Sequence, residues 1–162
     1  MYTQEDWNDI NKMLKKRWLM AAIPAVVVLS AAIAVFVIGR MHRSDSMWML
    51  TSFLTILGGG YFLFFYGVLV RPASIYRRHL SFMLNGRKRV TSGIFKEFSE
   101  DVCDRDGLEC HAMLVNIGEK NDPEDDRLFY YDAYKPYPSF ELGDKITVES
   151  NDKMVSAIKA FC

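Results

Sequence analysis

The chain has 162 residues, of which half are hydrophobic, and its 20 Lys and Arg residues balance its 20 Asp and Glu residues. This balance hides a split, since residues 1–90 carry 12 basic and 4 acidic residues and residues 91–162 carry 8 basic and 16 acidic residues. The acidic second half repels phosphate, which excludes a nucleic-acid polymer as a partner. The basic first half is suited to an anionic lipid surface.

Residues 1–17 are predicted to form an N-terminal amphipathic helix. Thr3 can cap this helix, and Asp6 follows three residues later at the spacing of a capping box. Apolar residues then recur at helical spacing, among them Trp7, Ile10 and Leu14. We expect this helix to lie at a membrane interface and to run into the apolar segment behind it. A partner-binding helix is the alternative.

Residues 18–70 are predicted to form a transmembrane helical hairpin with spans over 18–39 and 47–70. These runs of 22 and 24 residues contain no Asp, Glu, Lys or Arg. As helices they extend about 33–36 Å, which is enough to cross a hydrocarbon core of about 30 Å. Three consecutive glycines in the second run predict helix packing, with a hinge as the alternative; they are Gly58, Gly59 and Gly60.

Basic residues flank the hairpin before the first span and after the second, and are fewer in the connector between the spans. This pattern predicts a two-span protein of the cell membrane with both termini in the cytoplasm. The basic residues expected at the membrane surface are Lys15, Lys16, Arg17, Arg71, Arg77 and Arg78. The cytoplasm is reducing, so we expect no structural disulfides among the three cysteines.

Residues 71–86 are predicted to form a basic juxtamembrane helix that Pro72 opens and Asn85-Gly86 ends. Its apolar face includes Leu80 and Met83, and we expect this face to rest on lipid headgroups. His79 is then solvated or interfacial.

Residues 87–162 are predicted to form a small cytoplasmic β domain, because short strands follow one another without helical patterns between them. The predicted strands are 88–98, 108–117, 127–134, 145–149 and 154–161. The segment Leu142-Gly143-Asp144-Lys145-Ile146 resembles a turn into a strand in SH3-like and OB-like barrels. The expected fold class is α+β, with a two-helix transmembrane hairpin followed by a small antiparallel β-barrel that is OB-like or SH3-like.

An aromatic cluster between residues 129 and 140 is the leading candidate for a binding site. Alternate residues of a strand face opposite ways, so one set fills the core and the other can line a groove. Packing of the core and its edge by these rings is the preferred interpretation, because a small domain needs large aromatic side chains for stability, and a binding surface is the alternative. The residues predicted to bind a ligand or partner are Phe129, Tyr131, Tyr134, Tyr137, Arg105, Arg127 and Lys135.

Metal and catalytic patterns are incomplete in this chain. The segment Asp104–Glu109 matches a fragment of a calcium loop but is expected to be a hairpin turn. Cys103, Cys110 and His111 match no zinc spacing. The acidic run Glu119–Asp126 predicts a solvated loop, with a docking site for a basic partner or a divalent cation as the alternative. No histidine has a catalytic setting, so we expect neither an enzyme nor a cofactor.

The predicted function is a membrane-anchored, non-enzymatic binding or scaffold module. Its partners are expected to be the lipid bilayer, a second copy of the chain or another membrane protein, and a protein or small ligand at the β domain. The alternative is a ligand-gated effector whose spans oligomerise to perturb the bilayer. That arrangement resembles the two-span β-barrel effectors of bacterial cyclic-nucleotide defence systems, and the resemblance implies a nucleotide ligand.

Overall fold

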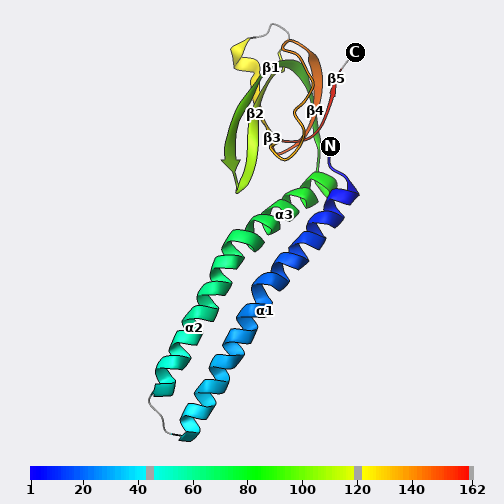
Figure 1. The fold of residues 1–162 in the computed structure, drawn as a ribbon. Helices are drawn as coiled ribbons and strands as arrows, with labels where there is room; N and C mark the ends of the chain where they lie inside the picture. Colours follow the sequence, from blue (N-terminus) through cyan, green and yellow to red (C-terminus); the bar gives the residue numbers. More distant parts are fainter. Residues whose placement is uncertain (43–45, 119–121, 161–162) are drawn as a thin grey trace. The chain divides into compact units, whose positions relative to one another are not determined.

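The computed structural model describes residues 1–42, 46–118 and 122–160, and these form two compact units (Figure 1). Residues 8–74 make up a helical unit. Residues 1–7 join residues 75 onward in a second unit, which we call the β unit.

The helical unit is built from α1 (Gln4–His42), whose first residues belong to the β unit, and α2 (Ser46–Phe65). The predicted amphipathic helix and the first predicted span are thus one continuous helix. Pro24 lies inside α1 and has no N–H to donate to the carbonyl of Met20, four residues earlier. The Tyr61 hydroxyl on α2 donates to that carbonyl at 3.0 Å, so the second helix supplies the missing donor.

A π-helical segment, Tyr66–Val70, continues α2 into α3 (Arg71–Asn85). The Arg71 N–H bonds to the Tyr66 carbonyl, five residues back. Pro72 therefore does not open a separate helix. Its ring would collide with a carbonyl of a regular α-helix, and a wider π turn just before it relieves this clash. The Arg17 guanidinium donates to the Leu69 carbonyl in this segment at 3.1 Å.

The three consecutive glycines of α2 have different surroundings. Gly58 is buried, and a Cβ added there would meet the side chains of Val28 and Leu29 on α1 at 3.1 and 3.3 Å. A Cβ added at Gly59 or Gly60 would meet no described atom within 4 Å. Among these three glycines, Gly58 is therefore the one that lies at a close contact between α1 and α2.

The N-terminal cap has the geometry that the sequence predicts. The Thr3 N–H donates to Asp6 Oδ2 at 2.8 Å, and the Asp6 N–H donates to Thr3 Oγ1 at 3.2 Å. Two N–H groups at the start of α1 are thereby satisfied.

The end of α3 packs against the sheet. Leu80 and Met83 are buried, and Met83 contacts Cys110 and Met154 in a small apolar cluster. The expectation that this apolar face rests on headgroups is therefore wrong at these two residues, because both are buried, Met83 among residues of the sheet. The helix ends at Asn85 as predicted, and the Asn151 side chain donates to the Phe82 carbonyl at 3.0 Å.

Five strands follow in one sheet whose order is β1-β2-β3-β5-β4. The sheet closes on itself, because the first part of β1 pairs with β4 and its second part pairs with β2. The strands are β1 (Arg89–Arg105), β2 (Leu108–Asn116), β3 (Asp126–Asp132), β4 (Lys145–Asn151) and β5 (Met154–Ala160).

The pairing of β3 with β5 is parallel, whereas the other four pairings are antiparallel. The prediction of a purely antiparallel sheet is wrong at this position. Five strands cannot alternate in direction all the way round a closed sheet, so at least one neighbouring pair must run the same way. The parallel register is a single residue pair, Tyr130 with Met154.

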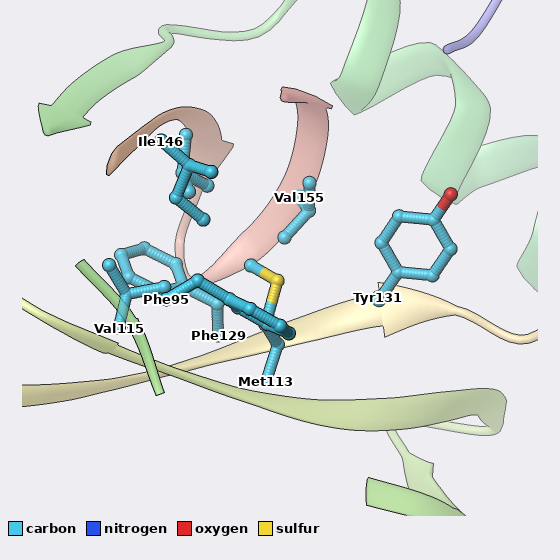
Figure 2. Packing of buried hydrophobic residues seen from close by; sticks show 8 residues of the cluster. Phe95, Met113, Val115, Phe129, Tyr131, Ile146 and Val155 are labelled. Atoms are coloured by element: carbon cyan, nitrogen blue, oxygen red, sulfur yellow. The ribbon is translucent and has the colours of Figure 1, made fainter. Parts of the chain in front are cut away.

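The interior of the sheet holds the main hydrophobic core, and every strand contributes to it (Figure 2). Alternate residues point inward, as Ile146 and Val148 do on β4. The buried core residues are Phe95, Met113, Val115, Phe129, Tyr131, Ile146, Val148 and Val155.

Two tight hairpin turns connect neighbouring strands. Asp106 and Gly107 join β1 to β2, with φ of 56° and 80°; Asp152 and Lys153 join β4 to β5, with φ of 45° and 71°. Positive φ at both central residues is the type I′ geometry, which matches the twist of the flanking strands. The predicted calcium-like segment is thus a hairpin turn, and Asp104 Oδ1 accepts the Gly107 N–H at 3.1 Å.

Candidate functional site

The two aromatic residues predicted on β3 lie in the core. Phe129 and Tyr131 are 6% and 5% exposed, and both belong to the central hydrophobic cluster. The Tyr131 hydroxyl donates to the Pro136 carbonyl at 2.6 Å. These rings therefore fill the interior, as the preferred interpretation of the aromatic cluster expects.

The two later tyrosines are exposed, at 66% for Tyr134 and 62% for Tyr137. The Tyr134 hydroxyl donates to Glu109 at 3.1 Å. The Tyr137 ring lies 5.5 Å from the Phe98 ring and 5.2 Å from the His111 ring, measured between centroids. These tyrosines cover other residues of the sheet and leave their outer faces accessible.

The three predicted ligand-binding cations have separate partners. The Arg105 guanidinium lies 4.2 Å from the centroid of the Tyr130 ring. Lys135 forms an ion pair with Asp6 at 3.0 Å, while Arg127 donates to the Asp126 carbonyl at 3.3 Å. Each of these three cations therefore contacts a different part of the β unit.

The basic residues predicted at the membrane surface are mostly exposed, as are Lys15, Lys16 and Arg71. Arg77 is exposed and stacks over the Trp7 ring, with 5.5 Å from guanidinium carbon to ring centroid. Arg78 lies over Phe82 at 5.9 Å. Stacking of this kind keeps the guanidinium charge accessible to anions.

A buried carboxyl group, Asp132, joins three parts of the β unit. Asp132 is 3% exposed and accepts hydrogen bonds from the Tyr2 hydroxyl at 3.1 Å and the Tyr76 hydroxyl at 3.0 Å. Its other oxygen accepts the Tyr134 N–H at 2.9 Å. The N-terminal segment, α3 and the end of β3 therefore meet at one carboxyl group. We call Asp132, Tyr2, Tyr76 and His79 the Asp132 cluster.

His79 completes this cluster. Its Nε2 lies 3.1 Å from the Tyr2 hydroxyl, and its side chain is buried rather than solvated or interfacial as predicted. Burial, reinforced by the charge of Asp132, raises the pKa of both Tyr2 and Tyr76. Burial lowers the pKa of His79, although Asp132 opposes the shift. At neutral pH the phenols are protonated donors and the imidazole is neutral.

The stability of the β unit is expected to fall as the pH drops below about 6.5, the ordinary pKa of histidine. Because the folded pKa of His79 is lowered, the unfolded chain takes up its proton first. The stabilisation from neutral His79 is complete at pH values above the pKa of His79 in the unfolded chain. It is lost as the pH falls through the lower pKa of His79 in the folded chain. Urea unfolding at about pH 7.5 and about pH 5.5 measures the change. His79→Gln should flatten the dependence and His42→Gln should not; an unchanged slope in His79→Gln contradicts this assignment.

The cysteines and acidic residues form no metal centre in the described parts of the chain. Cys103 and Cys110 are paired across β1 and β2, and the Cys103 thiol donates to the Cys110 carbonyl at 3.2 Å. Burial raises the pKa of Cys110 to about 12, so its thiol is protonated and unreactive at neutral pH. Of the acidic run, residues 119–121 lie outside the described residues, while Asp126 bonds with Lys96 and Asn116.

A groove of about 720 Å³ opens on the β unit, and we call it the basic groove. Its cations come from the segment between α3 and β1, from the start of β1, from β3 and from the β4–β5 turn. They are Arg87, Arg89, Arg127 and Lys153. Of these, only Arg127 is a candidate from the sequence. The other three carry no local signal, because their separation along the chain hides their proximity in the fold.

Comparisons of the chain with protein families, with characterised proteins and with solved structures find no match. Its function is therefore inferred from the chemistry of its own residues.

Proposed function

We propose that the chain is a membrane-anchored, non-enzymatic binding module. In this proposal α1 and α2 cross the bilayer, and the β unit lies in the cytoplasm, where it presents its surface to a ligand or partner. The order of the closed sheet, β1-β2-β3-β5-β4, supports an OB-like barrel as the presenting domain.

The observation that carries this proposal is the outward exposure of apolar side chains on both long helices. In the most apolar window of each helix, only 17% and 11% of residues are buried. Ile33 is 65% exposed, Ile56 74% and Leu63 70%. Water would make such a continuous apolar surface unfavourable, whereas lipid tails solvate it. A core helix of a water-soluble protein would have these side chains buried.

The orientation is tested by labelling intact cells with a membrane-impermeant maleimide. Ser46 is exposed at the start of α2, on the predicted outer side. We expect Ser46→Cys to be labelled in intact cells, because a charged reagent reaches only the outer face. The native chain is the control, because its cysteines all lie in the predicted cytoplasmic part and should react only after the cells are opened. Labelling of the native chain in intact cells would refute the orientation, and release of the chain from membranes by alkaline carbonate would refute the anchor.

The second candidate is the ligand-gated effector. The π-helical segment Tyr66–Val70 favours it, because π turns are rare, higher in energy and frequent at functional sites. The test is dye release from vesicles that carry the chain, triggered by a cyclic dinucleotide. Dye release would support the effector, and its absence at saturating ligand would reject it.

A further inference from the structure

The basic groove lies where β3 extends beyond its neighbour. In the parallel pairing of β3 with β5, Tyr130 lies opposite Met154, which is the first residue of β5. Residues 126–129 of β3 come before this pair and therefore have no partner on β5 in that register. The groove is lined by this part of β3, by the start of β1 and by the β4–β5 turn. The incomplete pairing leaves room that side chains of the sheet do not fill.

The groove concentrates positive charge in an otherwise acidic part of the chain. Of its two carboxylates, Asp126 is neutralised, because Lys96 approaches it at 3.0 Å and the Asn116 side chain donates to it at 2.6 Å. Asp152 is the remaining acid against four cations. Among the residues that the structure describes, Arg87, Arg89 and Lys153 form no ion pair. Uncompensated cations around a concave surface attract anions.

Lys153 occupies a strained position in this groove. It has a φ of 71° at the second central residue of a type I′ turn, where glycine is strongly preferred. Gly107 stands at the equivalent position of the β1–β2 turn, with a φ of 80°. A left-handed conformation is costly for a residue with a Cβ, and such strain is concentrated at functional sites. The choice of lysine at this position favours a role for its charge.

The remaining lining is suited to an organic ligand rather than to a bare ion. Ile117 and Leu128 contribute partly exposed apolar surface, and Thr91 and Ser150 contribute hydroxyl groups. A volume of about 720 Å³ is within the usual range of small-molecule sites. Guanidinium groups bind phosphate oxygens through paired hydrogen bonds, and lysine adds a point charge.

We propose that the basic groove binds the phosphate group of a small organic molecule, either a soluble nucleotide or a phospholipid headgroup. Arg87, Arg89, Arg127 and Lys153 hold the phosphate, and the apolar surface holds the group attached to it. This inference rests on the proposed binding module and names the chemistry of its ligand. It does not depend on the anchor, which the maleimide experiment tests separately.

The test has two arms, and both use the full chain. In the first, the chain in a zwitterionic detergent is titrated with adenosine monophosphate and with inorganic phosphate. In the second, the chain is placed in phosphatidylcholine nanodiscs with or without phosphatidic acid. The decisive variant is Lys153→Gly. It is expected to raise the melting temperature of the β unit by a few degrees, because it relieves the strained turn, and to weaken binding about tenfold, as loss of a charged contact does. Arg89→Gln should weaken binding to a similar extent.

Lys159→Gln is the matched control, since Lys159 is an exposed cation on β5 that does not line the groove and pairs with Glu149 at 3.5 Å. Saturable binding of the nucleotide that both groove variants weaken identifies a soluble phosphate ligand. A melting temperature raised by phosphatidic acid, and raised less in the Arg89→Gln variant, identifies a lipid headgroup. The proposal is overturned if no probe binds, or if Lys159→Gln weakens binding as much as the groove variants do. A more stable but weaker-binding Lys153→Gly chain excludes misfolding as the cause of lost affinity.

Discussion

Asp132→Ala is expected to lower the free energy of unfolding of the β unit by about 3–5 kcal/mol, because it removes a buried carboxylate and leaves three partly buried donors without an acceptor. These donors are the hydroxyls of Tyr2 and Tyr76 and the N–H of Tyr134. The measurement is urea unfolding of the full chain in detergent micelles, followed by near-ultraviolet circular dichroism. Six of the eight tyrosines lie in the β unit, so the tyrosine bands of this signal report mainly on that unit.

Two milder variants control for the loss of volume at Asp132. Asp132→Asn keeps one carbonyl oxygen as an acceptor and is expected to cost less than the alanine variant. Tyr76→Phe removes a single hydrogen bond to a charged group and should cost about 1.5–3 kcal/mol. The double variant Asp132→Ala with Tyr76→Phe should cost less than the sum of the two changes, because the residues interact directly. A loss below about 1 kcal/mol for Asp132→Ala would show that the cluster does not hold the unit together.

Phe129→Ala is expected to lower the free energy of unfolding by about 3–5 kcal/mol, the usual cost of removing a buried aromatic ring. Phe129 is 6% exposed and belongs to the central cluster in Figure 2. The same urea experiment measures this change. The result bears directly on the aromatic cluster, because a ring that only lined a ligand groove would contribute little to folding.

The neighbouring residue on β3 provides the matched control. Leu128 is 39% exposed, because alternate residues of a strand face opposite sides of the sheet. Leu128→Ala should therefore cost less than about 1 kcal/mol, in line with the smaller area that it buries. Equal losses for the two variants would contradict the inward orientation of Phe129.

Much of the local structure can be predicted from short sequence patterns. Thr3 and Asp6 predict their reciprocal hydrogen bonds, and Asp106-Gly107 predicts its turn, because the interacting residues are close along the chain. The two uncharged runs likewise predict helices long and apolar enough to cross a membrane. Alternation along each strand indicates which side chains face inward, although it cannot rank core packing above ligand binding for Phe129 and Tyr131.

The two prolines inside the long helices show what short sequence patterns cannot predict. Pro24 and Pro72 lack N–H donors, which can be read from the sequence. The compensation at Pro24 is a hydroxyl from Tyr61, and the compensation at Pro72 is a π turn before it. Neither can be deduced from spacing, because the first depends on which residue of α2 lies opposite Met20 and the second on how the helix continues.

The sequence by itself determined the two apolar helices, the capping box, the tight turns and the approximate strands. Each depends on residues within a few positions of one another. Only the tertiary structure decided the parallel β3–β5 pairing, the buried Asp132 cluster and the basic groove, because these join residues such as Tyr2 and Asp132 or Arg89 and Lys153. Their meeting depends on how the sheet closes and where α3 packs upon it, since closure brings together segments that no sequence pattern links.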